Sequence, residues 1–486
     1  MESYEKMRIP SEIFTFFTSP GGHSLIVRGV AGAGKTTFAL QVIEELAHIE
    51  KGYYFSTRVS DSALMQHFPW LEDRLMGIAY PSVKDPSGKI SQKSRNGLSK
   101  LKGLGSQQMG APKKEMSISI GRDLGELESL YELVETMAPA RTLIVIDSID
   151  ALAERYGMTF SSLISALQKD LVEGYGSNVL YVLENTEQSL DYLGDGVVIV
   201  SRSEFNRRRV REIEIVKLRG CEIQQPKYLF TLKGGKIQTF GYGSDRIPAH
   251  TGWMAIEDHN GHVSSGIIDL DRLTNGGLER GSMVLVELGP GVPSSVSGLI
   301  EQSLVANFVS MRRGVLWVPL RKVSADAVRT QMASLVSKEQ FERCVRVPEV
   351  ASQMEASAPY IMPVEGSNAA TDLKWKTISY SLSGTESPML SLLGFDTLES
   401  IYGEKVMDQM PEHLGIMKRN KGVCVCITSP SSRSKERLSD LANVHIKADR
   451  IGGTIVIYGE EPFTECNALA MEERAKGGKI SLTPIV

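Results

Sequence analysis

Residues 23–50 read HSLIVRGVAGAGKTTFALQVIEELAHIE, and this stretch decides the fold of the first half of the chain. It begins with an apolar run of strand length, continues through a glycine-rich turn, and ends in a segment whose apolar positions repeat with helical spacing. Three further apolar runs, at residues 52–57, 142–149 and 178–185, are separated by segments long enough for helices. This alternation predicts an α/β fold with a mainly parallel sheet flanked by helices.

The glycine-rich turn fits the pattern G-x-x-x-x-G-K-[ST] and lies between a strand and a helix, as that pattern requires. Glycines let successive backbone N–H groups surround phosphate oxygens, and the helix N-terminus adds partial positive charge. The lysine bridges the β and γ phosphates. We therefore predict an ATP site formed by Gly29, Gly32, Ala33, Gly34, Lys35, Thr36 and Thr37.

The predicted cofactors are ATP and Mg²⁺. The apolar run TLIVID ends in Asp147, which places a carboxylate at the end of a buried strand, and the hydroxyl of Thr36 follows the lysine of the loop. Hydroxyl and carboxylate oxygens are the groups that hold Mg²⁺ in nucleotide sites of this kind. The sequence therefore predicts a metal site at Thr36 and Asp147.

The second half of the chain repeats the order of elements of the first. MVLVELGPGVPSS parallels LIVRGVAGAGKTT, GVLWVPLRKVSAD parallels GYYFSTRVSD, MLSLLGFDTLES parallels TLIVIDSIDAL, and GVCVCITSP parallels NVLYVLENT. An internal period of about half the chain predicts a duplicated domain. The predicted boundaries are a first domain at residues 1–240, a linker at 241–265 and a second domain at 266–486.

The second copy lacks the residues that would hold a nucleotide. Where the phosphate-binding loop would stand, residues 289–295 read GPGVPSS, without the lysine and with a proline that removes one backbone N–H. We therefore predict a degenerate second domain that does not bind ATP. Asp396 and Glu399 keep the position of the acidic strand end, and we expect a structural role for them.

Two basic stretches lie in the first domain. Residues 82–117 form a polar insertion with eight Lys or Arg against two acidic residues, either a solvated loop or a surface for a polyanion or protein partner. Further along, Lys217 and Arg219 stand two residues apart on an expected strand, so they are predicted to project from one face. That pair is either a solvated basic strand or, in a ring of chains, a contact with a neighbour's γ phosphate. The run Arg207–Arg209 fits nucleic acid or an acidic partner equally well.

The composition of the whole chain excludes other classes of protein. Its 54 Lys and Arg against 58 Asp and Glu give a net charge of −4, which is no strongly basic field. The five cysteines are too few and too scattered for a disulfide framework, and Cys424 and Cys426 stand in an apolar run that predicts a buried strand. With no leader sequence and no apolar run of membrane length, we expect a cytoplasmic protein without membrane contact.

The sequence resembles the KaiC and RadA group of RecA-type ATPases over nearly the whole chain. SSGIIDLDRLTNGGLERGS, at the opening of the second copy, and DGVVIVSRSEFNRRRVREIEIVKLRG, which closes the first, are similar to that family's sequences at the same places. The combination STRVSDSALMQHFPWL with the arginine-rich stretch resembles the archaeal gas-vesicle regulator group, GvpD. The resemblance implies two tandem RecA-like domains and a homo-oligomer such as a hexameric ring, and it favours an inter-subunit phosphate contact for Lys217 and Arg219.

One departure from the KaiC pattern concerns hydrolysis. RecA-like folds usually carry a glutamate at the end of the strand after the P-loop helix, where it activates the attacking water. Here Thr57 and Arg58 stand at that place, and Asp61 or Glu184 would have to substitute from nearby. Arg58 itself either contacts a phosphate or forms an ion pair. We therefore predict that the nucleotide binds well and turns over slowly.

Three functions are compatible with this sequence. The leading hypothesis is a KaiC/GvpD-like regulatory protein, in which ATP bound in the first domain controls assembly or the binding of a regulatory partner, and hydrolysis is slow or absent. The first alternative is a DNA-dependent RecA/RadA-like ATPase; the negative net charge and the lack of aromatic residues in 82–117 argue against it. The second alternative is a KaiC-like protein kinase or autokinase.

Overall fold

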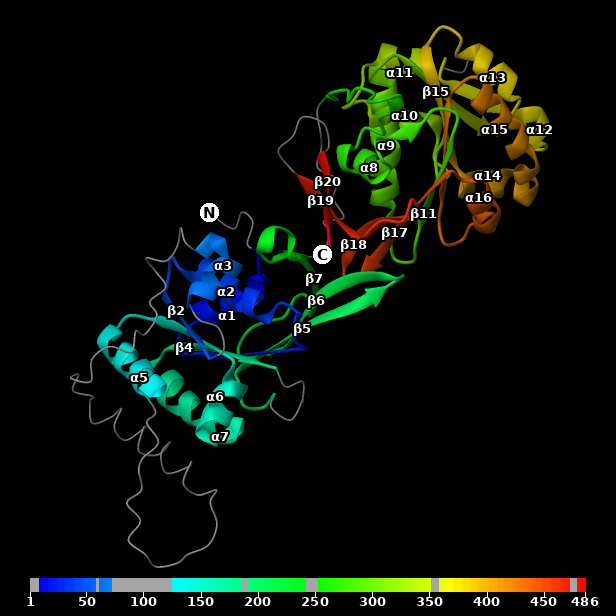
Figure 1. The fold of residues 1–486 in the computed structure, drawn as a ribbon. Helices are drawn as coiled ribbons and strands as arrows, with labels where there is room; N and C mark the ends of the chain where they lie inside the picture. The colour runs from blue at the N-terminus through cyan, green and yellow to red at the C-terminus, as the bar shows by residue number, and fades with distance from the viewer. Residues whose placement is uncertain are drawn as a thin grey trace, which may run out of the picture. The chain divides into compact units, whose positions relative to one another are not determined.

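The computed structural model describes residues 8–57, 61–71, 125–184, 191–241, 252–350, 358–472 and 479–486. The chain divides into two compact units: unit 1 is Met1–Gly241 with Ile485–Val486, and unit 2 is Tyr242–Pro484. Figure 1 shows the two units in their sequence colours. Residues 252–265, which we expected in the linker, are part of unit 2. The basic insertion at 82–117 lies outside the described residues.

Unit 1 is built on one sheet with the strand order β2-β3-β4-β1-β5-β6-β7-β8. The first five strands in that order are parallel, and β6, β7 and β8 join them by antiparallel pairing. The four apolar runs that the sequence singled out are the four strands on one side of β5, as predicted. The strands are β1 (Ser24–Arg28), β2 (Lys51–Ser56), β3 (Thr142–Asp147), β4 (Asn178–Leu183), β5 (Gly196–Phe205), β6 (Arg208–Leu218), β7 (Lys227–Thr231) and β8 (Gln238–Phe240).

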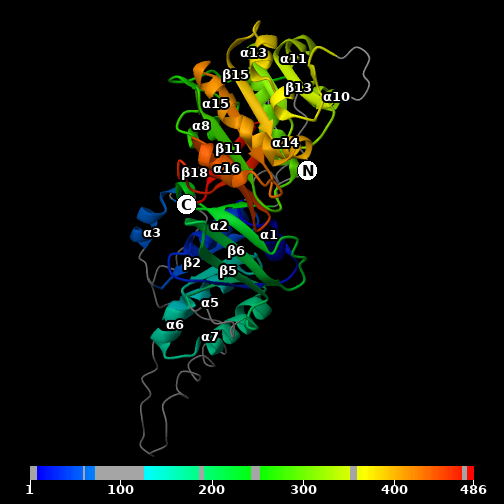
Figure 2. The same ribbon diagram turned by 90° about the vertical axis from the view of Figure 1, so that its right-hand side faces the viewer.

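Helices cover both faces of this sheet, and each face has its own apolar cluster. Leu25 and Val27 of β1 pack in the cluster with α1, α2 and α3, whereas Ile26 packs on the other face with α5, α6 and α7. Figure 2 shows these helices around the unit 1 sheet. Because both faces are covered, the central strands are continuously apolar. The helices are α1 (Ser11–Thr18), α2 (Lys35–Leu46), α3 (Asp61–His67), α5 (Gly125–Met137), α6 (Ile149–Tyr156) and α7 (Phe160–Leu167), followed by the π-helical turn η2 (Gln168–Gly174).

Unit 2 has a larger sheet with the strand order β14-β13-β12-β15-β16-β11-β17-β18-β19-β20. Without β13 and β14 at one edge, this is the strand order of unit 1, with β11 in the place of β1 and β17 in the place of β5. The repeat seen in the sequence is therefore a repeat of topology. The strands are β11 (Met283–Leu288), β12 (Arg313–Val318), β13 (Val345–Val350), β14 (Ile361–Val364), β15 (Glu386–Gly394), β16 (Val423–Thr428), β17 (Val444–Ile451), β18 (Thr454–Glu461), β19 (Asn467–Glu472) and β20 (Lys479–Pro484), with a separate pair β9 (His262–Val263) and β10 (Leu278–Glu279).

The unit 2 sheet is also enclosed by helices on both faces. Trp317 of β12 packs with α8, α9, α10 and α11, and its neighbour Leu316 packs with α12 to α16 on the opposite face. Two mainly parallel sheets flanked by helices confirm the predicted α/β fold. The helices are α8 (Ile268–Leu273), α9 (Ser294–Ser310), α10 (Ala325–Met332), α11 (Lys338–Cys344), α12 (Ala369–Asp372), α13 (Trp375–Ser381), α14 (Phe395–Tyr402), α15 (Met410–Arg419) and α16 (Lys435–Leu441), with the 3₁₀ segment η5 (Gly403–Gln409) before α15.

None of the helices within the described ranges combines the length and the apolar character that crossing a bilayer would require.

A buried carboxylate on α9 fixes the loop that follows β12. Glu301 is 5% exposed, and it accepts hydrogen bonds from the Trp317 indole Nε1 at 2.9 Å and from the backbone N–H of Leu320 at 3.2 Å. Both donors favour the carboxylate, but the loss of hydration on burial outweighs them and raises the pKa of Glu301 to about 7. The carboxyl group of Glu301 is therefore a pH-sensitive part of the unit 2 core.

We predict that this glutamate makes unit 2 less stable as the pH rises. The folded state holds the Glu301 proton more tightly than the unfolded chain, so its contribution is complete below about pH 4.5 and is lost by about pH 7. The cost of Glu301→Gln should therefore be larger at pH 5 than at pH 8, by on the order of 3 kcal/mol. Urea unfolding followed by tryptophan fluorescence measures this difference, with the exposed Glu339→Gln as control. A cost of Glu301→Gln that does not change with pH would contradict the prediction.

Candidate nucleotide-binding site

The loop between β1 and α2 is shaped by its glycines. A Cβ at Gly29 would overlap the carbonyl oxygen of Val200 on the neighbouring strand β5, so only glycine fits where the loop crosses that strand. Gly32 and Gly34 have φ values of +73° and +114°, which residues other than glycine rarely adopt. The loop therefore turns sharply from the end of β1 into the first residue of α2, Lys35.

Lys35 lies over the loop that precedes it. Lys35 is 6% exposed. Its Nζ donates hydrogen bonds to the carbonyl oxygens of Gly29 at 2.7 Å and Val30 at 3.0 Å. These contacts hold the ammonium group at the centre of the loop, where a phosphate bound by the loop amides and the α2 N-terminus would meet it. Binding of a phosphate at this place stays a prediction.

Thr36 and Asp147 are brought together at the edge of the sheet. The Thr36 hydroxyl Oγ1 donates to Asp147 Oδ2 at 2.7 Å, and the hydroxyl of Tyr54 on β2 donates to the same oxygen at 2.8 Å. A hydroxyl and a carboxylate at this separation are hard oxygen ligands that suit Mg²⁺. The predicted metal pair thus fits the ion, and Tyr54 orients its carboxylate. Sequence reasoning missed Tyr54, because a tyrosine within an apolar strand carries no motif.

A buried arginine supports the loop from the side of β6. The Arg211 guanidinium Nη1 donates to the carbonyl oxygens of Gly32 at 3.2 Å and Ala33 at 3.0 Å, and its Nε donates to the Val486 carbonyl at 2.9 Å. Burial, together with the charges of Arg209 and Arg202, lowers the pKa of Arg211. Its partners are distant in sequence, so the spacing of residues could not assign it this role.

The end of β2 carries no carboxylate, as the sequence predicts. The Thr57 hydroxyl is within hydrogen-bond distance of the backbone of Asp147 and Ser148, so it is engaged with the end of β3. Arg58 lies outside the described residues. Glu184 follows β4 with an exposed side chain, and its backbone N–H donates to the Asp150 carboxylate at 2.8 Å.

Lys217 and Arg219 lie at the opposite end of the sheet from the loop. Leu218 at the end of β6 pairs with Gly196 of β5, which in turn pairs with Leu25 of β1. Four residues of strand separate Leu25 from Gly29, which is about 13 Å. The side chains of the pair contact the segment before β5, since Lys217 Nζ donates to the Asp191 carbonyl at 2.8 Å and the Arg219 guanidinium pairs with Asp195 at 2.7 Å.

The corresponding loop of unit 2 also passes over the neighbouring strand, but it has no lysine at its end. A Cβ at Gly289 would overlap the carboxylate of Asp449 on β17, which has the place of β5. Helix α9 begins at Ser294, where the helix of unit 1 begins with Lys35, and Pro293 precedes it. No lysine therefore stands at the helix start in unit 2.

The structure corrects our placement of Asp396 at the acidic strand end. Asp147 is the last residue of β3 in unit 1, whereas the last residue of β15 in unit 2 is Gly394. Asp396 lies on α14 and accepts from the N–H of Ser429 at 3.1 Å, as Asp150 accepts from Glu184 in unit 1. The segments around Asp147 and Asp396 have similar composition. In unit 2, however, the helix has already begun where the acidic residue stands.

Glu399, Cys424 and Cys426 of unit 2 contact other parts of the fold and do not line a metal site. Glu399 accepts hydrogen bonds from the N–H of Ser434 at 2.8 Å and the hydroxyl of Ser432 at 3.0 Å, so it caps a turn. Cys424 and Cys426 are fully buried on β16, as the sequence predicts. In the part of the chain that the structure describes, no group of three or more His, Cys, Asp and Glu residues is placed to hold a metal ion.

The strand order, the helices on both faces and the loop between β1 and α2 define unit 1 as a P-loop domain of the RecA-like kind. Residues 13–216 match the family described as the GvpD gas vesicle protein, P-loop domain, and residues 252–359 match GvpD basic region 2. The chain is a KaiC/GvpD-like P-loop protein.

Known relatives extend this likeness over the whole chain. Protein GvpD2 of Halobacterium salinarum is 25% identical over 508 positions, which cover 98% of this chain and 96% of that protein. Protein GvpD1 of the same organism is 22% identical with the same coverage. The circadian clock oscillator protein KaiC of Acaryochloris marina is 26% identical over 58% of this chain and 52% of its own length. These relatives confirm the resemblance found in the sequence.

The name of the second matched region does not describe the charge of this chain. Residues 252–359 hold ten Lys and Arg against twelve Asp and Glu. A net-basic field of the kind that attracts nucleic acid is therefore not present across this region as a whole.

We predict that Lys35→Ala abolishes ATP binding, because the substitution removes the cation that the loop holds at its centre. The loss should be roughly 100-fold or more in affinity, as expected for a charge-assisted contact to phosphate. Equilibrium dialysis with labelled ATP and Mg²⁺ measures the binding, and Ser295→Ala in unit 2 is the matched control that should bind normally. Stoichiometric binding to both units, or unchanged binding by Lys35→Ala, would contradict the site.

Proposed function

We propose that this protein is an ATP-dependent regulatory protein, in which ATP with Mg²⁺ binds in unit 1 and its presence controls assembly or a protein partner. The observation that carries the proposal is the meeting of three groups at one sheet edge: the P-loop amides, the Lys35 ammonium and the Thr36–Asp147 pair. Bound Mg²⁺ would neutralise phosphate charge there, and Thr36 and Asp147 would orient it. Unit 2 lacks both the lysine and the strand-end aspartate, so it serves as a scaffold or a partner surface.

We further propose that the nucleotide lies between two chains of a homo-oligomer. Lys217 and Arg219 lie about 13 Å along the sheet from the loop of their own chain, so a phosphate that they contact belongs to another chain. In a ring of chains, the amino-terminal edge of one sheet can face the P-loop edge of the next. Two cations there would add to the charge that holds the nucleotide.

Slow hydrolysis follows from the groups at the end of β2. Thr57 cannot act as a general base, and its hydroxyl is engaged with the backbone of Asp147 and Ser148. A water near the γ phosphate therefore lacks a carboxylate from this strand to orient it. A long-lived bound ATP suits a regulatory state, because binding alone stabilises the liganded form.

We predict a turnover well below 1 per second for the purified protein with saturating ATP and Mg²⁺, compared with typical enzymes at about 10 per second. A phosphate-release assay measures it, and Lys35→Ala gives the background rate. Turnover near 1 per second or above, absent in Lys35→Ala, would show that another group replaces the missing carboxylate. The role of slow turnover in the proposal would then be wrong.

We predict that ATP with Mg²⁺ raises the assembly state, and that the double variant Lys217→Gln with Arg219→Gln prevents this rise. The ATP affinity of the unassembled chain should stay within about threefold of wild type, because the two side chains do not line their own loop. Native mass spectrometry with and without nucleotide measures the assembly. The control is Lys227→Gln, which removes an exposed cation that pairs with Glu214 at 3.4 Å. An ATP-dependent assembly that persists in the double variant would contradict the inter-subunit contact.

A further inference from the structure

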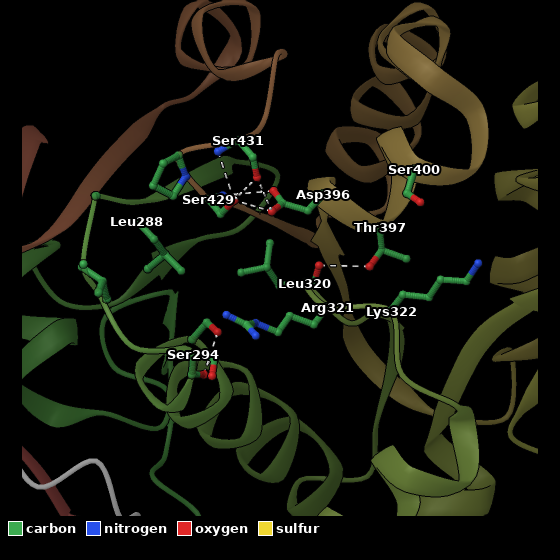
Figure 3. A pocket seen from close by; sticks show the side chains of 15 residues that line it. Leu288, Ser294, Leu320, Arg321, Lys322, Asp396, Thr397, Ser400, Ser429 and Ser431 are labelled. Atoms are coloured by element: carbon green, nitrogen blue, oxygen red, sulfur yellow. Dashed lines mark hydrogen bonds between the residues drawn. The ribbon is translucent and has the colours of Figure 1, made fainter.

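Unit 2 contains a cavity of about 400 Å³ at the carboxyl edge of its sheet. Figure 3 shows its side chains, which come from the loop before α9, the loop after β12, the start of α14 and the loop after β16. A volume of this size is typical of small-molecule sites. The polar residues among its lining are mostly hydroxyls, with two cations and one carboxylate: Ser294, Ser297, Arg321, Lys322, Asp396, Thr397, Ser400, Ser429 and Ser431.

The loop that carries Arg321 is fixed from three directions. The buried Glu301 accepts from the Leu320 N–H at 3.2 Å, and the buried Thr397 hydroxyl donates to the Leu320 carbonyl at 3.0 Å. The Leu320 backbone also fills the space in which a Cβ at Gly394 would lie. The backbone beside Arg321 therefore has little freedom.

Arg321 supplies the positive charge of the cavity. Its side chain points toward Ser294 at the first turn of α9, whereas Lys322 points away (Figure 3). Arg321 is exposed to solvent, and no hydrogen bond or ion pair joins its guanidinium to any residue in the described part of the chain. The helix α9 has 17 residues, and neither a side-chain cap nor an acidic residue stands in its first turn. A cation and a helix N-terminus thus face the same space, and both favour an anion.

The one carboxylate among the lining residues does not cancel this charge. Asp396 accepts from the Ser429 N–H at 3.1 Å, from the Ser429 hydroxyl, and from the Ser431 hydroxyl at 3.3 Å. These donors satisfy the carboxylate from the side of β16, and Figure 3 shows it turned toward the two serines. Asp396 therefore does not neutralise Arg321, whose charge stays available to a ligand.

We propose that this cavity binds the phosphate group of a small molecule, without a metal ion. Arg321 would donate to the phosphate oxygens in the forked geometry that suits them, and the amides and hydroxyls at the start of α9 would donate from the other side. The rest of the cavity combines hydroxyls, such as those of Ser400 and Ser431, with apolar residues such as Val292, which fits a body with both hydroxyls and an apolar face, such as a sugar. A triphosphate with Mg²⁺ does not fit, because no lysine starts α9 and Gly394 replaces the strand-end aspartate.

The test uses the full chain with Lys35→Ala, in which the unit 1 site is disabled, and with EDTA present. Inorganic phosphate, ribose 5-phosphate and ribose are titrated by calorimetry. We expect one site per chain for a phosphate-bearing probe and none for ribose. Adding Arg321→Gln should weaken binding about 10-fold or more, as for loss of a charge-assisted contact. Adding Lys322→Gln, which removes the same charge from the next residue, should change the affinity by less than about threefold.

The two phosphate probes distinguish the source of the phosphate group. Tighter binding of ribose 5-phosphate assigns the site to a phosphorylated metabolite, and equal binding assigns it to free phosphate. The proposal is overturned if neither probe binds, if Arg321→Gln binds as well as the parent, or if Lys322→Gln weakens binding as much as Arg321→Gln does. Thermal unfolding of each variant verifies that it is folded. Because Lys35→Ala is the parent, failure here leaves the proposed ATP site of unit 1 untouched.

Discussion

The fold of each unit depends on the tight crossing of one strand by the loop that follows the central strand. In unit 1 the backbone at Gly29 lies directly against the Val200 carbonyl of β5, and in unit 2 Gly289 lies against Asp449 of β17. A side chain at Gly29 would push the loop away from the backbone of β5 and displace the helix that follows it, whereas one at Gly289 would first displace the Asp449 carboxylate. The packing of the sheet therefore requires the first glycine of the P-loop in unit 1, independently of phosphate binding.

The passage of the loop over the neighbouring strand and the binding of phosphate depend on different residues. A domain can therefore keep the first and lose the second. Unit 2 retains the strand order and the first glycine, yet α9 begins with Ser294 and the strand-end aspartate is replaced by Gly394. The space at Gly394 is taken by the backbone of Leu320. The end of β15 thus carries no metal ligand and packs closely against the loop that carries Arg321.

The sequence was sufficient for the features that depend on neighbouring residues. The strands of unit 1, the P-loop and Asp147 could be predicted, because apolar runs and a compact motif are local signals. It was insufficient where contacts join distant segments. Tyr54 and Arg211 reach the site from other strands, and their contacts with Asp147 and the loop carbonyls depend on strand register. Asp396 was misplaced for the same reason, because the place where a strand ends and a helix begins is poorly defined in the sequence.

Arg211 shows what such long-range contacts can add to a nucleotide site. Its guanidinium donates at once to the loop carbonyls of Gly32 and Ala33 and to Val486, which follows the last strand of unit 2 in the chain but packs within unit 1. A planar guanidinium cannot move toward one set of acceptors without changing its geometry to the other. Any rearrangement of the loop carbonyls therefore alters the hold on residues 485–486. Within unit 1, Arg211 therefore contacts both the P-loop and the carboxyl-terminal residue Val486.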